Sequence, residues 1–549
     1  MSEPASGAIK ADLDAVVVGA GFAGLYMIHK LRSLGLSVRG FEAGSGVGGT
    51  WFWNRYPGAR CDVYSLEYSY SFDAALEREW VWTERYPAQA EILRYLEHVA
   101  DRFDLRRHIR FRSRVVAMTW NETEKLWTLR LADGDQLTTR FVVTCIGVLA
   151  QPTLPNLEGM ADFKGQSFHT YWWPKEPVAL EGRRVGVIGA GATAIQVIST
   201  IADKVGTLTV FQRRPNWSTP LHNSSISSEE MADIRRRYDE IFARCSESPG
   251  GFEHIPDRRG FWTLSKEERT AFWNQLYEQP GFAMLNANFV EIFMDEAANR
   301  ELSDFVADKI RQRVKDPQTA ENLIPKDHGY GMQRVPLETN YFEAFNRHNV
   351  RLVNISQTPI QRVTPTGIAT SEEHFDLDLI VYATGFDAIT GGFDQIDIQG
   401  TDGVRLADKW RDGPSTYLGV ATHGFPNLLM VAGPQSVSGS TNFPRAIETG
   451  VDWITRLLAH ALDHSVSRLE AREADERGWG EVVRRAQHRM LLQNGRGWFT
   501  GYNSNVAGHE AGRQRYVAYW GGGPKYTALL KEAQDARERA QQLSGQNAH

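Results

Sequence analysis

Cysteine is scarce in this chain. Only Cys61, Cys145 and Cys245 occur among 549 residues, an odd number at wide spacing. They can form neither a disulfide framework nor a CxxC redox pair. Reductases of the thioredoxin-reductase type, which need a cysteine pair for thiol–disulfide exchange, are therefore excluded.

Long apolar runs and an excess of basic charge are also missing. No apolar run approaches the roughly 20 residues that cross a bilayer, and the N-terminal stretch MSEPASGAIKADLD lacks the apolar core of a signal peptide. We therefore expect a cytoplasmic protein without a membrane partner. The net charge of -6 comes from 61 basic and 67 acidic residues mixed along the chain, so nucleic acid is not an expected partner. No metal is expected.

Near the N-terminus the sequence has a glycine-rich turn. Residues 14–18 are apolar and predict a strand, Gly19, Gly21 and Gly24 fit GxGxxG, and the following residues have helical spacing. Glu42 ends the next predicted strand, 23 residues after Gly19. This combination predicts a dinucleotide site, with the pyrophosphate at the helix N-terminus and ribose hydroxyls on Glu42. The alternative is an accidental glycine turn.

A second turn of this kind follows residues 184–188, before a predicted helix at 192–203 and a strand at 207–212. Its residues are Gly189, Ala190, Gly191, Ala192, Thr193 and Ala194, with alanine in the third place, a variant that the fingerprint tolerates. The strand ends in Arg213 and Arg214 rather than in an acid. Arginine can bind a 2'-phosphate, so NADPH is favoured over NADH unless these are ordinary solvated residues.

The rest of the chain predicts further elements around these two turns. Residues 221–330 are polar and helix-rich, with a capping box from Ser265 to Glu268 and a helix closed by Pro317. Residues 376–385 predict a buried strand, helices are expected near 446–462 and 471–492, and the tail from about 533 is expected to be a frayed helix. Tryptophans cluster around glycines at 50–56, 172–173 and 498–520. They are explained either by simple packing or by the walls of a flat ring cofactor.

Two longer segments carry a family resemblance. From residue 48 the chain reads GGTWFWNRYPGARCD, and from 163 it reads FKGQSFHTYWWP. The second segment fits FxGxxxHTxxWP at six positions, Phe163, Gly165, His169, Thr170, Trp173 and Pro174. With GPSTYLG at 413–419, GFPN at 424–427 and GWFTGYN at 497–503, these segments resemble type I Baeyer–Villiger monooxygenases. Within that family, the segments IRQRVKDPQTAENLIPKDHGYG and RVPLETNYFEAFNRHNV resemble the cycloalkanone and camphor-pathway branch most. The resemblance runs from Val16 to about Tyr526.

The resemblance implies an enzyme that uses FAD, NADPH and O2 to convert a cyclic or aryl ketone into an ester or lactone through a flavin peroxide. It implies that Arg334 is the catalytic arginine and that Asp62 is its acidic partner. A permanent guanidinium charge suits the negative oxygens of such a reaction. Small cycloalkanones, bulky terpenoids or steroids, and aryl ketones all stay open as substrates. The expected assembly is a monomer or weak homo-oligomer.

The resemblance also implies the cofactor-binding residues outside the two turns. On the flavin side these are Gly49, Thr50, Trp51, Trp53, Tyr68, Val115 and Phe443. On the nicotinamide side these are Gln196, Gln333 and Trp498, with Trp498 closing from a loop whose Gly495, Gly497 and Gly501 supply hinge freedom.

His169 and Gln333 each allow more than one role. His169 could be a general base, but we favour a structural role at the linker between two dinucleotide domains. Gln333 departs from the family, which commonly has lysine before the catalytic arginine to help bind the NADPH phosphate. We therefore expect NADPH to be used with weaker 2'-phosphate discrimination than in relatives that have the lysine.

Two other functions are compatible with the two glycine turns. A flavin monooxygenase of sulfur or nitrogen centres would use both turns, but it has serine after the fingerprint histidine, so Thr170 and Arg334 argue against it. A non-catalytic nucleotide sensor would have no reason to keep Arg334, Asp62 and an aromatic wall.

The predicted architecture is α/β, with two Rossmann-like dinucleotide-binding domains and a helical insertion. The expected segments are FAD domain 1–145, NADP domain 150–220, insertion 221–330, NADP domain 331–379 and FAD domain 380–549. We expect the substrate at the junction of the two domains.

Overall fold

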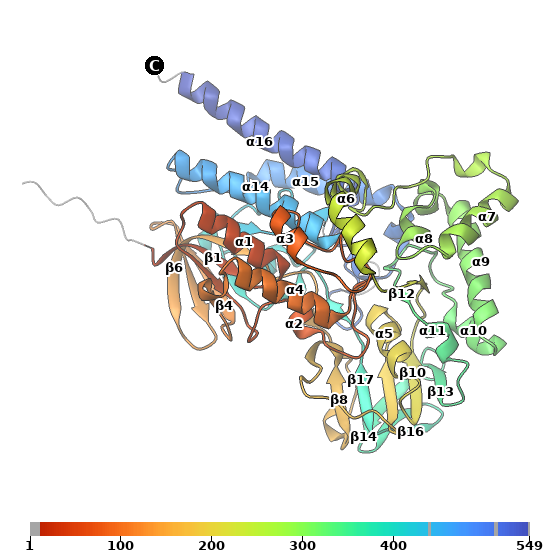
Figure 1. The fold of residues 1–549 in the computed structure, drawn as a ribbon. Coiled ribbons are helices and arrows are strands. Elements are labelled where there is room, and N and C mark those ends of the chain that lie inside the picture. Colours follow the sequence, from red (N-terminus) through yellow and green to blue (C-terminus); the bar gives the residue numbers. More distant parts are fainter. Residues whose placement is uncertain (1–10, 438–440, 510–513, 547–549) are drawn as a thin grey trace, which may run out of the picture.

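Two β-sheets, each built around one of the glycine turns, organise the molecule (Figure 1). The computed structural model describes residues 11–437, 441–509 and 514–546. Mixed helices and parallel strands confirm the predicted α/β class.

The larger sheet has eight strands in the order β19-β4-β5-β6-β1-β2-β3, with β20 also paired to β6. Its strands are β1 (Leu13–Val18), β2 (Val38–Phe41), β3 (Ile109–Arg110), β4 (Val115–Asn121), β5 (Leu126–Leu131), β6 (Gln136–Thr144), β19 (Asp397–Gln399) and β20 (Leu428–Met430). Strands β1, β2, β3 and β20 pair in parallel, whereas β4, β5 and β6 form an antiparallel meander. Residues from both ends of the chain therefore build one sheet.

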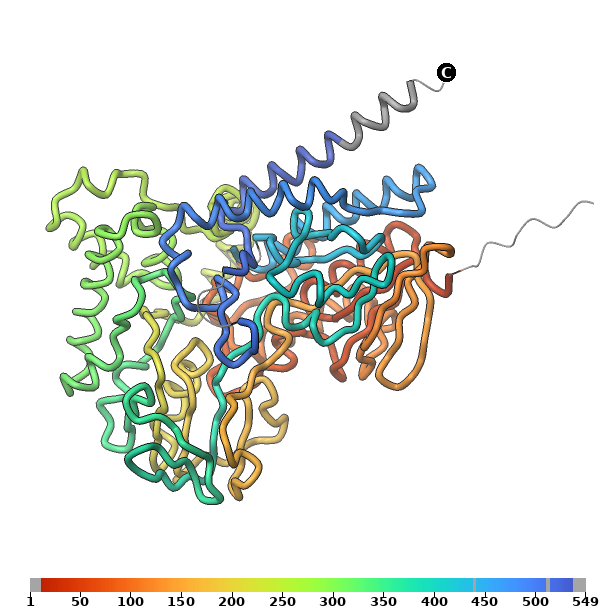
Figure 2. The backbone as a smooth tube through the Cα atoms, turned by 180° about the vertical axis from the view of Figure 1, so that it is seen from behind, coloured from red at the N-terminus to blue at the C-terminus, as the bar shows by residue number. Residues whose placement is uncertain are grey.

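Both faces of this sheet are covered, which explains why the buried residues of β1, Ala15 to Val18, are all apolar. Ala15 and Val17 pack on one side in a core with α1 (Phe22–Ser33), α4 (Gln89–Arg102) and α14 (Phe443–Asp463). Val16 and Val18 pack on the other side with residues of β4 and β5. Figure 2 shows the C-terminal segment, in blue, lying along the N-terminal segment, in red.

Shorter and peripheral helices complete this part of the molecule. They are α2 (Thr50–Trp53), α3 (Ala74–Glu79), α12 (Gly391–Asp394), α13 (Leu406–Lys409), α15 (Glu473–His488) and α16 (Gly523–Gln546). The tail expected to be helical from about 533 belongs to α16, and residues 547–549 lie outside the described residues.

The smaller sheet has five parallel strands in the order β13-β10-β9-β17-β8. Its strands are β8 (Gln166–His169), β9 (Arg184–Ile188), β10 (Thr207–Gln212), β13 (Val350–Asn354) and β17 (Leu379–Tyr382). Helices α5 (Ala192–Ile201) and α11 (Tyr341–Ala344) pack together and share a core with one face of the sheet. The small sheet β14 (Ile360–Thr364), β15 (Gly367–Thr370) and β16 (His374–Asp376) shares a core with the other face.

Two short strand pairs tie segments that are distant in the sequence. They are β7 (Gln151–Pro152) with β18 (Phe386–Asp387), and β11 (Thr219–Pro220) with β12 (Leu337–Glu338).

The helix-rich segment begins with α6 (Ser228–Glu247) and continues through α7 (Lys266–Tyr277), α8 (Ala283–Asn286), α9 (Glu296–Arg313) and α10 (Pro317–Leu323). It divides between the two cores. Helix α6 contacts α3 and α16 beside the larger sheet, whereas α7 to α10 pack in the core of the smaller sheet. Figure 1 shows α7, α9 and α10 as a separate group at the side of the molecule.

Most expected elements are confirmed within a few residues, and the capping box of Ser265 and Glu268 is present at the start of α7. One local expectation is wrong. Pro317 does not close α9, which already ends at Arg313, but begins α10, where its missing N–H has no intrahelical partner to lose. The expected domain boundary after residue 379 falls inside β17. No helix in the described ranges is long and apolar enough to cross a membrane.

Candidate active site

The first glycine turn joins β1 to α1, as the sequence predicts. Gly19 has φ of +108°, and a Cβ there would lie 2.5 Å from the carbonyl oxygen of Cys145. A Cβ on Gly24 would lie 1.9 Å from the carbonyl oxygen of Gly19. A side chain at either position would force the turn away from β6 or the helix away from the strand, so both positions require glycine.

Glu42 follows β2 and lies beside this turn. Its carboxylate oxygens accept hydrogen bonds from Ala20 N at 2.9 Å and from Gly44 N at 2.6 Å. Burial raises the pKa of Glu42, and these backbone N–H groups oppose that rise. The carboxylate therefore holds the turn in shape, and each oxygen keeps a second lone pair for a ribose hydroxyl.

Aromatic side chains from the segment that follows the first glycine turn form one wall of the candidate site. Trp51 Nε1 donates to the hydroxyl of Tyr68 at 3.3 Å, and the two rings meet edge to face. Trp53 stacks on Tyr171 with ring centroids 5.3 Å apart and planes at 12°. Tyr171 directly follows the fingerprint residues His169 and Thr170. The stack therefore connects the segment after the first glycine turn to the fingerprint segment 163–174.

The second glycine turn joins β9 to α5, and β10 ends directly before the arginine pair. Arg214 forms an ion pair with Asp327 at 3.3 Å and donates to the carbonyl oxygen of Arg496. Arg213 forms no ion pair with any residue that the structure describes. Burial and the neighbouring charge of Arg214 lower the pKa of Arg213. Arg213 is thus the member of the pair that is available to an anion.

Both glycine turns open into one cavity of about 1700 Å³. Most residues expected to bind cofactors line it: Gly19, Gly21, Glu42, Gly49, Thr50, Trp51, Trp53, Asp62, Tyr68, Val115, Phe443, Gly189, Ala190, Gly191, Ala192, Thr193, Gln196, Arg213, Arg214, Gln333, Arg334 and Trp498. Gly24 and Ala194, in the third place of each turn, do not line it but lie buried behind it. None of the six fingerprint residues lines it either.

Arg334 and Asp62 meet in this cavity although 272 residues separate them in the chain. One guanidinium nitrogen of Arg334 donates to Asp62 Oδ1 at 2.7 Å, and another donates to the carbonyl oxygen of Val335 at 2.9 Å. The guanidinium carbon also lies 4.8 Å from the ring centre of Phe282. The Arg334 side chain is 31% exposed, so the guanidinium is held on two sides and open on a third.

The segment before Asp62 is fastened to α5. The Tyr56 hydroxyl donates to Gln196 Oε1 at 2.8 Å, and Gln196 Nε2 donates to the carbonyl oxygen of Arg60 at 3.0 Å. Asp62 is therefore positioned from the helix that begins at the second glycine turn. This arrangement places the Asp62 carboxylate where the part of the molecule built on the larger sheet meets the part built on the smaller sheet, which we call the two units.

His169 ends β8 and is 3% exposed. Its Nδ1 accepts from Tyr171 N at 3.1 Å, so the ring proton is on Nε2, which donates to the carbonyl oxygen of Gly385 at 3.2 Å. Burial lowers the pKa of His169 to about 4. A neutral ring with both nitrogens in use cannot accept a proton from a substrate without breaking these contacts.

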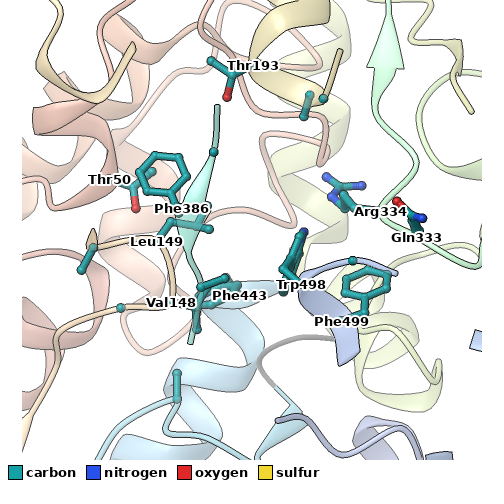
Figure 3. A pocket seen from close by; sticks show the side chains of 18 of the residues that line it. Thr50, Val148, Leu149, Thr193, Gln333, Arg334, Phe386, Phe443, Trp498 and Phe499 are labelled. Atoms are coloured by element: carbon teal, nitrogen blue, oxygen red, sulfur yellow. The ribbon is translucent and has the colours of Figure 1, made fainter. Parts of the chain in front are cut away.

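The segment around Trp498 covers the cavity beside Arg334. Trp498 and Phe443 pack in the same apolar cluster, and a Cβ on Gly497 would be 3.4 Å from the Gln333 side chain. In Figure 3, Gln333 and Arg334 lie at one side of the cavity and Thr50 at the other, with Trp498 between them. Of the three glycines expected as hinges, only Gly501 has a positive φ, at +76°.

Some cavity residues were not predicted from the sequence. Val148, Leu149 and Phe386 follow β6 and β17 (Figure 3), and the carboxyl ends of parallel strands could have indicated them. Phe282 and His254 come from the helix-rich segment, where no local pattern points to a site. Burial lowers the pKa of His254 to about 4, so it faces the cavity as a neutral ring.

The charge of the cavity fits two phosphate-bearing cofactors. Among the described residues that line it, nine are arginine or lysine and two, Glu42 and Asp62, are acidic. Both acids already bind partners within the protein. A cavity with this excess of positive charge and with two glycine turns at helix N-termini suits FAD at the first turn and NADPH at the second.

Known proteins of similar sequence and structure match nearly the whole chain. A model of the family described as flavin-binding monooxygenase-like matches residues 13–231. A 2-oxo-Δ3-4,5,5-trimethylcyclopentenylacetyl-CoA monooxygenase of Pseudomonas putida is 43% identical over 94% of this chain and 95% of its own length. A phenazine N-monooxygenase of Lysobacter antibioticus is 40% identical over 96% of both.

The crystal structure of OTEMO in complex with FAD and NADP matches 96% of this chain and 98% of its own, with a TM-score of 0.92 and 42% identity. A Baeyer–Villiger monooxygenase of Pseudooceanicola batsensis is 38% identical over 95% of both chains. With the two glycine turns, the fingerprint and the paired Arg334 and Asp62 in one cavity, the chain belongs to the FAD- and NADP-dependent Baeyer–Villiger monooxygenases of the flavin-binding monooxygenase-like family.

Proposed function

We propose that this enzyme inserts one oxygen atom of O2 beside the carbonyl of a cyclic ketone, with Arg334 and Asp62 as the catalytic pair. The reaction consumes ketone, O2, NADPH and a proton, and yields ester or lactone, water and NADP+. The observation that carries the assignment is the contact between Arg334 and Asp62 in a cavity that both glycine turns line. An ion pair at the surface, away from both turns, would have had no such meaning.

FAD, when bound, carries the electrons of NADPH to O2. The protein supplies charge and position around that chemistry. The Arg334 guanidinium stays protonated at every working pH and is open toward the cavity, where it can stabilise negative charge that develops on oxygen. Asp62 and the carbonyl of Val335 fix the orientation of the guanidinium.

We assign FAD to the unit of the larger sheet and NADPH to the unit of the smaller sheet. Two sets of cavity-lining residues support this assignment: Gly19, Gly21 and Glu42 at the first turn, and Gly189, Gly191 and Arg213 at the second. The substrate is assigned to the space between Arg334, Trp498 and Phe443 (Figure 3). A cytoplasmic location and a monomeric or weakly associated state stay predictions from the sequence.

Oxidation of a nitrogen or sulfur centre is the alternative function. The Lysobacter relative, 40% identical to this chain, is named as a phenazine N-monooxygenase. Membership of the wider flavin-binding monooxygenase-like family therefore does not by itself decide between ketone and heteroatom oxygenation.

The test uses purified holoenzyme, NADPH, 18-oxygen-labelled O2 and a panel of cyclic and aryl ketones, with sulfides and amines as competitors. A ketone product heavier by one labelled oxygen supports the proposal. Oxidised sulfide or amine, with only hydrogen peroxide from every ketone, would favour the alternative.

Arg334→Ala separates the catalytic role from cofactor binding. We expect this variant to bleach the flavin with NADPH but to form ester or lactone at least about a hundredfold more slowly, the usual loss for one preorganised charge-stabilising group. Stopped-flow absorbance and product analysis measure the two steps. Retained oxygenation in Arg334→Ala would remove Arg334 from the mechanism.

A further inference from the structure

Three cations of the C-terminal part of the chain, Arg485, Arg489 and Lys525, line the cavity. All three side chains are exposed and also line the cavity, which places them at its opening. Arg485 lies in α15, Arg489 directly follows that helix, and Lys525 lies in the first turn of α16. We call these three residues the rim cations.

Their spacing brings the rim cations to the cavity together with apolar neighbours. Val482, Arg485, Ala486 and Arg489 follow one another at i, i+3, i+4 and i+7, which is one side of a helix. Lys525 and Leu529 repeat the i, i+4 pair on α16, and Leu529 also lines the cavity. The opening therefore combines positive charge with short apolar walls.

The rim cations have no carboxylate partner within the described part of the chain, because none of them takes part in an ion pair there. Two arginines near the start of α15 are paired: Arg477 contacts Glu473 at 2.8 Å, and Arg472, which precedes the helix, contacts Asp475 at 2.7 Å. Arg484 has no ion-pair partner among the described residues but does not line the cavity, so Arg485 and Arg489 are the arginines of this region that are both without an ion pair there and at the cavity.

The cofactors do not account for these charges. The phosphates of FAD and NADPH are assigned to the two glycine turns and to Arg213, which lie in β1–α1 and β9–β10. The rim cations belong instead to the C-terminal helices.

We propose that the rim cations bind a negatively charged group, a carboxylate or a phosphate, that the ketone substrate carries several bonds away from its carbonyl. This inference rests on the proposed ketone oxygenation. The apolar walls would hold the carbon chain between the carbonyl and the anion. Since the rim cations are exposed, each contributes modestly and the attraction weakens with salt.

The experiment compares 2-oxocyclopentylacetate with its neutral methyl ester on the holoenzyme. We expect the acid to have the higher kcat/KM at about 20 mM salt and to lose that advantage near about 500 mM, where the Debye length falls to a few ångströms. Arg485→Glu, Arg489→Glu and Lys525→Glu should each lower kcat/KM for the acid about fivefold, the upper range for an exposed ion pair, and leave the ester nearly unchanged.

Arg484→Glu is the matched control, because Arg484 is an exposed neighbour on α15 that does not line the cavity. It should leave both substrates unchanged, and all four variants should keep the flavin content and the KM for NADPH of the wild type. The CoA thioester of the same acid distinguishes the sources of charge. Because the thioester carries phosphates but no carboxylate, a loss for the thioester in the Glu variants that exceeds the loss for the acid identifies phosphate, whereas a loss for the acid with none for the thioester identifies carboxylate.

Failure of the inference differs from failure of the proposed function. If the acid and the ester are oxygenated equally in wild type and variants, the rim cations do not bind substrate although the ketone chemistry stands. If neither ketone is oxygenated, the proposed function is in question. Titration calorimetry of both ketones with the NADP+-loaded holoenzyme then decides: equal affinity of acid and ester, unaffected by the Glu variants, overturns the inference.

Discussion

At the scale of single residues, Arg213 and Arg214 are adjacent in sequence but differ in what they can bind. Asp327 already neutralises Arg214, whereas Arg213 has no ion-pair partner within the described residues. We expect Arg213→Ala to raise the KM for NADPH by about 10- to 100-fold, the range for a lost charge-assisted hydrogen bond, and to leave the KM for NADH unchanged. Arg214→Ala should have the smaller effect, and steady-state kinetics with both coenzymes measure it.

Gln333 gives the complementary test, since it lies beside Gly497 at the edge of the cavity without a charge. Gln333→Lys should strengthen the preference for NADPH by about tenfold. A wild-type preference for NADPH of several thousandfold would contradict the weak discrimination that we expect.

Glu67 is a buried carboxyl that no sequence pattern indicates. Burial and the nearby charge of Glu253 raise its pKa to about 8, although the Glu253 N–H, at 3.1 Å, stabilises its anion. Between about pH 4.5 and 8, the Glu67 carboxyl is therefore protonated in the folded state and ionised in the unfolded state. The stability that this proton provides is complete below pH 4.5 and is lost as the pH rises through 8.

Glu67→Gln should remove this dependence because the amide does not titrate. We expect the wild-type Tm to fall by a few degrees more than the variant Tm between pH 6 and pH 9, measured by circular dichroism. Parallel curves for the two proteins would show that Glu67 is ionised in both states.

At the scale of elements, the fingerprint segment 163–174 connects β8 to the chain that follows β17 through hydrogen bonds. His169 caps the turn Thr170–Trp172 through Nδ1 and donates to Gly385 after β17, while β8 pairs with β17 along its length. The motif was recognisable only through its resemblance to a family. Its spacing has no helical or strand period that would have revealed these hydrogen bonds.

Changes at His169 should therefore lower stability and leave the acid–base chemistry intact. His169→Asn can keep the cap but not the bond to Gly385, and His169→Phe loses both, each loss costing about 1–3 kcal/mol. We expect Tm to decrease in that order, with the pH profile of kcat/KM between pH 6 and 9 unchanged in shape. Loss of one limb of that profile in His169→Asn would restore the role of a general base.

Local patterns predicted the strand–turn–helix units and the capping box, because hydrophobic period, glycine and cap residues act within a few positions. They could not predict that α6 joins the core of the larger sheet while α7 to α10 join the other. The amphipathic pattern of a helix predicts which of its faces is buried, but not which element that face packs against.

At the scale of the whole molecule, the sequence predicted two dinucleotide-binding units, and the comparison with known structures confirms them. The strands β19 and β20 were missed, since three-residue strands carry too little periodicity to detect. The contact of Arg334 with Asp62 depends on how the two units meet, so only the resemblance could pair these residues beforehand.

The junction itself can be tested at Tyr56. Its hydroxyl donates to Gln196 on α5, and Tyr56→Phe removes this hydrogen bond while keeping the ring. We expect flavin reduction by NADPH to slow a few-fold and more NADPH to be lost as hydrogen peroxide, because the two units are held less firmly. Stopped-flow reduction rates and peroxide yield measure both effects. Unchanged coupling in Tyr56→Phe would mean that other contacts align the units.

The order of strands also dictates an order of events during synthesis. The smaller sheet closes when β17, ending at Tyr382, leaves the ribosome, whereas the larger sheet waits for β20 and for α14, which ends at Asp463. The unit of the smaller sheet can thus fold while the unit of the larger sheet still lacks its last strand, β20. The apolar face of α1, which ends at Ser33, then stays exposed until α14 begins at Phe443, about four hundred residues later. A newly made chain of this protein therefore has its greatest need of a chaperone before Asp463 emerges, and at its N-terminal unit.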